Sequence, residues 1–156
     1  MKTTRLTKKL GMFLKSIFQK KLKVSYIPQS NDNACGAAVL EMVYKYYGLE
    51  NILQEEIFEK YKQLEPHGTG NIRLDTESLV ADAQGRGFLS FWARVNHNDA
   101  GSSFELLKRL TMDSKIPVIV CQKLSDEQPL IGHFRIVVGV RDNIVYLGGQ
   151  FTQVGP

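Results

Sequence analysis

Cysteine, long apolar runs and acidic residues near the N-terminus are scarce or absent in this 156-residue chain. Its two cysteines are too few for a disulfide framework, so the sequence does not require an oxidising compartment. No apolar run approaches the roughly 20 residues that a membrane-spanning helix needs. Internal repeats and low-complexity segments are also absent. The length fits one domain that can bury a substantial core.

Acidic side chains are missing from residues 1–23, although these residues hold eight basic ones. The whole chain has 20 basic and 16 acidic side chains, so the residues that follow hold 12 and 16, a net charge of −4. The basic character therefore belongs to an N-terminal segment, taken as residues 1–24. The body, residues 25–156, lacks the basic footprint of a nucleic-acid-binding domain, and we expect no nucleic-acid partner.

The N-terminal segment is a poor match to a secretory signal. Lys15 interrupts its short apolar stretch, and no small-residue cleavage site follows. Its apolar residues recur at helical spacing between lysines: Leu10, Phe13, Leu14, Ile17 and Phe18. Two interpretations stay open, an amphipathic helix on an anionic membrane surface and a basic leader whose apolar side packs on the domain. The features together favour the cytoplasm, and the first of the two interpretations would place the protein at the inner membrane surface.

Apolar periodicity in the body predicts mainly helices first and strands last. Helices are expected over residues 34–47, 54–63, 76–84 and 103–112. Asp32 or Asn33 is expected to cap the first of these helices, Thr76 the third and Ser103 the fourth. Strands are expected over residues 88–95, 117–122, 133–140 and 144–147. The last two form a β-hairpin, and the nearly continuous apolar run 117–122 suits a central strand. This order of elements predicts an α+β domain.

Cys35 lies where a polar, irregular segment gives way to the first predicted helix. At a helix N-terminus, unpaired backbone N–H groups and the positive end of the helix dipole favour the reactive thiolate. The alternative is a small buried core residue, which is common for a free cysteine. Gly36 favours the reactive interpretation, since a helical glycine costs roughly 1 kcal/mol relative to alanine and would let a substrate backbone pass close to the sulfur.

A nucleophilic thiol needs a base, and the chain has three histidines. His67 and His97 lie in predicted loops, whereas His133 opens a predicted strand. A cysteine on an early helix and a histidine on a late strand is the arrangement of helix-plus-sheet thiol proteases. Cys121, inside a predicted strand, is expected to be an inert buried thiol. The cysteines and histidines lack metal-ligand spacing, so we expect neither a metal nor a cofactor.

The stretches "IPQSNDNACGAAVLEMVYKYYG" and "HFRIVVGVRDNIVYL" resemble the C39 peptidase family of papain-like cysteine peptidases. The resemblance covers about residues 25–150. It implies a papain-like fold in which N-terminal helices pack on a C-terminal antiparallel sheet. By position it implies that Cys35 is the nucleophile, that His133 is the base and that Gln29 is the oxyanion-hole glutamine. The family's best-known members cleave bacteriocin leader peptides after a double glycine, so the resemblance implies a peptide or protein substrate of that kind.

The third position of the family's triad departs from the pattern, because Gly149 stands where the family has an aspartate. Asp142 is no substitute, since it lies in the predicted hairpin turn about 25–30 Å from His133 at 3.3 Å per residue. If residues 141–142 form a two-residue loop, Gln150 lies opposite His133 and offers it a carbonyl oxygen. Either Gln150 orients the base or the site is a Cys–His dyad.

Two other functions stay open on the sequence. The same Cys–His chemistry suits a cysteine acyltransferase, and a degenerate domain of this fold would bind a leader peptide without cutting it. Non-cleaving relatives usually lose the nucleophile, so the presence of Cys35 favours an enzyme.

Overall fold

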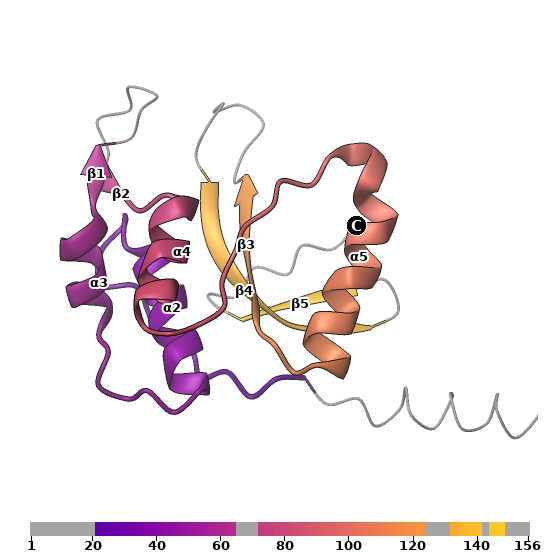
Figure 1. Ribbon diagram of the computed structural model, residues 1–156, viewed down its shortest axis with the longest axis horizontal. Coiled ribbons are helices and arrows are strands. Elements are labelled where there is room, and N and C mark those ends of the chain that lie inside the picture. The colour runs from indigo at the N-terminus through magenta and orange to yellow at the C-terminus, as the bar shows by residue number, and fades with distance from the viewer. Residues whose placement is uncertain (1–20, 65–71, 124–131, 142–143, 149–156) are drawn as a thin grey trace, which may run out of the picture.

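The computed structural model describes residues 21–64, 72–123, 132–141 and 144–148 (Figure 1). Its helices are α2 (Cys35–Tyr46), α3 (Gln54–Tyr61), α4 (Thr76–Gly85) and α5 (Ala100–Lys108), with a short 3-10 turn (His97–Asp99) before α5 and a π-helical turn (Arg109–Asp113) after it. Its strands are β1 (Gln63–Leu64), β2 (Ile72–Arg73), β3 (Val118–Lys123), β4 (Gly132–Arg141) and β5 (Ile144–Gly148).

A three-stranded antiparallel sheet, in the order β3-β4-β5, separates two helical layers. Helices α2, α3 and α4 lie on one side of the sheet and α5 lies on the other (Figure 1). Strands β1 and β2 form a separate two-stranded ribbon. The α+β fold with early helices packed on a late antiparallel sheet is therefore confirmed, as is the β4–β5 hairpin.

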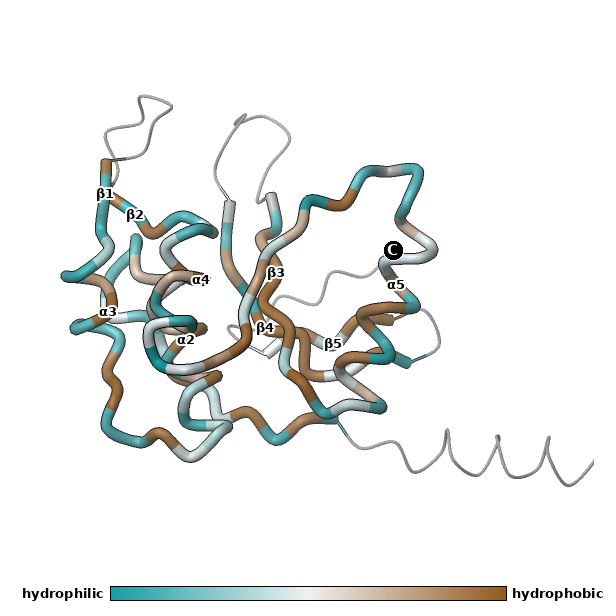
Figure 2. Tube along the Cα trace, viewed as in Figure 1, coloured by the Kyte–Doolittle hydropathy of each residue, from teal (hydrophilic) through white to brown (hydrophobic). Residues whose placement is uncertain are grey.

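Alternate side chains of β4 fill two apolar clusters, one on each face of the sheet. Phe134, Ile136 and Val138 pack against α2 and its neighbours. Val137 and Val140 pack with Met112 and the apolar face of α5. A β-bulge lies between Val137 and Gly139, and it shifts the register with β5. Because both faces are covered, β4 is buried along most of its length, and Figure 2 shows the hydrophobic residues gathered there and on β3.

The apolar run 117–122 is not a central strand, because β3 lies at the edge of the sheet and β4 occupies the centre. Its continuous apolar character has another cause. Ile119 packs in the α2 cluster, while Val118 and Val120 pack in the α5 cluster. Helices cover both faces of this edge strand. Its residues are therefore apolar because both faces are covered, and not because a strand lies on each side of it.

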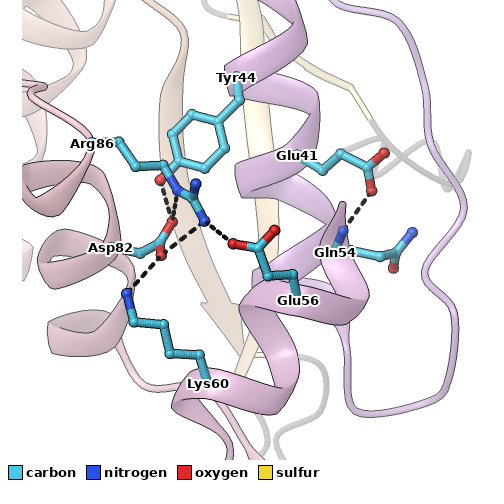
Figure 3. A network of polar contacts seen from close by, with 7 residues as sticks. All are labelled: Glu41, Tyr44, Gln54, Glu56, Lys60, Asp82 and Arg86. Atoms are coloured by element: carbon cyan, nitrogen blue, oxygen red, sulfur yellow. Dashed lines mark hydrogen bonds and ion pairs between the residues drawn. The ribbon is translucent and has the colours of Figure 1, made fainter. Parts of the chain in front are cut away.

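A buried polar network ties the three helices of one layer together (Figure 3). The Tyr44 hydroxyl donates to Asp82 Oδ2 at 2.6 Å, and Arg86 Nε donates to the same oxygen at 2.8 Å. Arg86 also pairs with Glu56 on α3 at 3.1 Å. Asp82 is only 1% exposed, and its charge is acceptable because two donors surround it. The network fixes α2, α3 and α4 relative to one another.

Three predicted helix caps are wrong. Neither Asp32 nor Asn33 caps α2, because Asn31 Oδ1 accepts the Asn33 N–H at 2.9 Å in a local turn instead. Asp75, not Thr76, caps α4, where its carboxylate accepts the Ser78 N–H at 2.7 Å. Helix α5 begins at Ala100, before Ser103, and it has no side-chain cap.

Residues 88–95 are not a strand, although their aromatic content predicts one. The segment runs in an irregular path from α4 to the start of α5 (Figure 1). Leu89 is 98% exposed and Phe91 is 78% exposed, so these side chains find no covered face. Aromatic and apolar content alone does not form a strand without a partner that supplies the ladder hydrogen bonds.

Residues 21 and 22 contact the central sheet. The Leu22 N–H donates to the Val138 carbonyl at 2.7 Å, and its side chain is buried in the α2 cluster. Lys21 lies over the ring of Tyr146 with Nζ 3.5 Å from the ring centroid. The amphipathic pattern predicted at residues 10–18 lies outside the described residues. Among the residues that are described, no helix is long and apolar enough to cross a bilayer.

Candidate active site

Cys35 is the first residue of α2, as the sequence predicts, and it is 8% exposed. The helix forms because a run of good helix formers follows the Asn31 turn, and its apolar face packs on the sheet. The thiol is therefore carried by the first helical turn, whose backbone N–H groups have no intrahelical acceptor. The helix ends at Tyr46, and Gly48 follows it with φ of 85°, a conformation that favours glycine after a helix.

His133 is the second residue of β4, and it is half-buried. Burial lowers the pKa of its imidazole, and the cations of Arg135 and Arg73 lower it further. Both effects disfavour the protonated ring. At neutral pH His133 is therefore neutral, the form that accepts a proton.

Gln29 lies in the extended segment that leads into α2. Its side-chain amide donates to the Asn31 carbonyl at 2.9 Å. The same carbonyl accepts the Ala34 N–H at 3.1 Å, one residue before the thiol. An amide nitrogen carries two hydrogens, so one donor of Gln29 remains available after this contact.

One pocket brings the three predicted residues together. Gln29, Cys35 and His133 all line it, and the space between its lining atoms, about 330 Å³, includes open solvent. Tyr26, Ile27, Ala38, Val39, Met42, Phe134, Arg135 and Gly148 complete its wall. Within the described residues Cys35 and His133 share the pocket without a hydrogen bond between them. Catalytic hydrogen bonds of this kind often tighten only when substrate binds.

Gly36 does not leave room for a substrate, contrary to the prediction. A Cβ built there would lie 3.1 Å from Leu79 Cδ1, 3.2 Å from Phe134 Cδ2 and 3.3 Å from Leu74 Cβ. The protein's own side chains therefore occupy the space beside Gly36. The glycine allows α2 to pack closely on its neighbours, which is the second common reason for a glycine inside a helix.

The hairpin closes one residue later than the two-residue loop at 141–142 requires. Arg141 is the last residue of β4 and pairs with Ile144. The bulge then shifts the register, so that Ile136 pairs with Gly148 at the last described pair. Asp142, Gly149 and Gln150 lie outside the described residues.

Gln122 is a residue near His133 that the sequence analysis missed. It lies directly across from His133 in the β3–β4 ladder. Residues paired in this way project their side chains on the same face of a sheet. Gln122 Oε1 is buried and has no hydrogen-bond partner in the described part of the chain. Correct pairing of 117–122 with 133–138 would have found it, but the sequence does not fix that register.

Cys121 lies on β3 as predicted, but it is exposed rather than buried. Its position on an edge strand explains the difference. His67 lies outside the described residues, and His97 belongs to the 3-10 turn before α5. Among the residues that the structure describes, no group of three or more His, Cys, Asp or Glu side chains could hold a metal ion.

An α+β domain with a helix-start cysteine and a strand-start histidine lining one pocket has the arrangement of papain-like thiol peptidases. The family comparison agrees with this class. The chain matches the Peptidase_C39 like family over residues 21–148, and it belongs to that family. The matched range includes Gln29, Cys35 and His133. The comparison with curated proteins finds no match.

Proposed function

We propose that this protein is a cysteine peptidase that cleaves peptide bonds through an acyl-enzyme. The observation that carries the proposal is the pocket shared by Cys35, His133 and Gln29. Family membership supports a peptidase-like domain of this kind. A peptide or protein is therefore the proposed substrate.

In the proposed reaction His133 takes the proton of Cys35, and the thiolate sulfur attacks the scissile carbonyl carbon. The carbonyl oxygen becomes an oxyanion, which the Gln29 amide and the Cys35 backbone N–H stabilise by roughly 3–4 kcal/mol. His133 then gives its proton to the leaving amine as the C–N bond breaks. Water hydrolyses the resulting thioester and restores the thiol.

The group that orients His133 is either Gln150, through its side-chain carbonyl, or absent, which leaves a Cys–His dyad. Gln122 is a further candidate, because its buried Oε1 faces the same side of the sheet as the imidazole. An amide oxygen orients the ring without adding negative charge. Comparing Gln122→Leu with Gln150→Ala separates the candidates. Loss of turnover in one variant identifies the orienting residue, and unchanged turnover in both leaves the dyad.

A double-glycine leader is the proposed substrate class, and it rests on family resemblance. The packing of Leu74, Leu79 and Phe134 beside Gly36 removes the argument that a cleft over Gly36 selects glycine. A panel of quenched leader peptides tests the class. Replacing the two glycines before the cut with leucines should abolish cleavage, and equal cleavage of both peptides would remove the proposal.

Cleavage itself is tested with the same peptides and with Cys35→Ala. The wild type should release two fragments, and Cys35→Ala should release none. A wild type that binds the peptide without cutting it would support the leader-binding alternative. Transfer of the acyl group to an added amine in preference to water would support the acyltransferase alternative.

The proposed location is the cytoplasm, where a reduced thiol is maintained. The basic N-terminal segment is proposed to contact anionic lipid, with each positive charge worth roughly 1 kcal/mol near the surface. Sedimentation with phosphatidylserine vesicles should show binding that falls with salt and is lost without residues 1–20. Equal, salt-independent non-binding by both proteins would rule the contact out.

A further inference from the structure

Gln54 holds the backbone on both sides of Gln29. It is the first residue of α3, and it is only 5% exposed. Its side-chain Oε1 accepts the Ser30 N–H at 2.8 Å, and its Nε2 donates to the Pro28 carbonyl at 2.9 Å. One amide group therefore bonds the residue before Gln29 and the residue after it, as a neighbouring strand would.

The backbone N–H of Gln54 is in turn bonded by a buried carboxylate. The Gln54 N–H donates to Glu41 Oε2 at 2.9 Å (Figure 3). Glu41, on α2 and 4% exposed, also pairs through Oε1 with Lys45 at 2.8 Å. The Glu41 carboxylate thus satisfies a donor at the N-terminus of α3, which has no cap of its own.

These contacts matter because the segment that carries Gln29 has no regular structure. Pro28 and Ser30 are exposed, and residues 21–29 form neither helix nor strand. Among the described residues, Gln54 supplies the hydrogen bonds that tie residues 28–30 to the rest of the fold. A buried amide with both polar atoms bonded fixes its partners more rigidly than exposed contacts do.

We propose that Gln54 is a positioning residue for the oxyanion hole, fixing Gln29 relative to Cys35. The proposal rests on the proposed peptidase function, since the oxyanion hole has a role only there. Glu41, which lies on the same helix as the Cys35 thiol, binds Gln54 and so connects α3 to α2. The chain of contacts from α2 through α3 to residues 28–30 sets the distance between the nucleophile and its oxyanion donor. A misplacement of about 1 Å in such a group lowers turnover by about 100-fold.

The test compares Gln54→Met, which keeps the side-chain length and removes both hydrogen bonds, with Ile57→Val. Ile57 is fully buried on the same helix, and its truncation costs about 1 kcal/mol of stability but removes no hydrogen bond to residues 28–30, because its side chain is apolar. Two rates are measured for each variant. Turnover of the quenched leader peptide needs the oxyanion hole, whereas alkylation of Cys35 by iodoacetamide needs only the thiolate.

We expect Gln54→Met to lower kcat by about 10- to 100-fold with little change in KM or in the alkylation rate. It should also weaken a peptide aldehyde inhibitor, which forms a tetrahedral adduct with the thiol. Ile57→Val should leave both rates near the wild-type values. In a Gln29→Ala background, which itself costs about 100-fold, Gln54→Met should have almost no further effect.

Three outcomes would overturn the proposal. The first is a kcat for Gln54→Met equal to that of Ile57→Val. The second is a fall in the alkylation rate as large as the fall in kcat. The third is an effect of Gln54→Met on kcat that is as large in the Gln29→Ala background as in the wild type. A wild type that alkylates at an ordinary rate and cleaves no peptide refutes the proposed function instead, and the positioning role with it.

Discussion

At the scale of single residues, the same short stretch produced one correct prediction and one wrong one. Cys35 is at the start of α2, because the helix boundary depends on local sequence. Gly36 was interpreted as an opening for substrate, whereas Leu74, Leu79 and Phe134 fill that space. These partners lie 38 or more positions away in the chain. Local spacing predicts where a residue lies along an element, but it does not predict which distant side chains pack against it.

Replacing Gly36 with alanine tests the packing account. The added methyl group would meet three buried side chains at 3.1–3.3 Å, so overpacking should outweigh the gain in helix propensity. We expect a net loss of about 1 kcal/mol in the free energy of unfolding, measured by urea denaturation. Gly101→Ala is the matched control, since Gly101 is also the second residue of its helix and has nothing within 4 Å. A stabilised Gly36→Ala protein would contradict the account.

The pKa of His133 yields a prediction about pH. Burial and the cations of Arg135 and Arg73 hold this pKa below its ordinary value, so the neutral base persists below pH 6.5. Removing a cation in Arg135→Gln should raise the pKa and shift the acid limb of the kcat/KM profile to higher pH. Arg109→Gln, which removes the same charge from an exposed position after α5, should leave that limb in place. A shift in the opposite direction would refute the electrostatic reasoning.

At the scale of secondary-structure elements, segments with a strongly periodic apolar pattern formed the predicted helix or strand, and segments with a weak pattern did not. The helices at residues 35–46 and 54–61 and the hairpin of β4 and β5 agree with their patterns. The expected strand at 88–95 does not form, because no strand in the described part of the chain pairs with it. The register across from His133 could not be predicted either. Nothing in the sequence fixes the β3–β4 pairing that places Gln122 opposite His133, and a bulge in β4 shifts the separate register with β5 by a residue that no sequence pattern marks.

The contacts between elements make a prediction about stability. Asp82 joins α4 to α2 through Tyr44 and, while buried, accepts hydrogen bonds from Tyr44 and Arg86. Asp82→Asn removes the charge that balances Arg86, and we expect a loss of about 3 kcal/mol in the free energy of unfolding. Tyr44→Phe removes one hydrogen bond and should cost only about 1 kcal/mol. Thermal and urea denaturation measure both. Equal small losses would show that the network contributes little.

At the scale of the whole molecule, the fold class and the meeting of three residues in one pocket were predictable for different reasons. The α+β class follows from the order of helical and strand patterns, and the structure confirms it. The meeting of Gln29, Cys35 and His133 came from resemblance to a family, since no local rule brings positions about 100 residues apart into one pocket. The group that orients His133 was not predictable, because the chain departs from the family's triad at Gly149. Gln122 became a candidate for orienting His133 only because the observed strand register places it opposite that residue.

The central claim is that the pocket activates Cys35, and competitive labelling of the two thiols in the same chain tests it most directly. Cys121 is exposed and Cys35 is only 8% exposed, so accessibility alone predicts that Cys121 reacts first. Limiting iodoacetamide at pH 6.5, followed by mass spectrometry of the peptides, measures the ratio. The account predicts that Cys35 is alkylated faster than Cys121, and that His133→Ala reverses the order. Faster labelling of Cys121 in the wild type, unchanged by His133→Ala, would contradict the account.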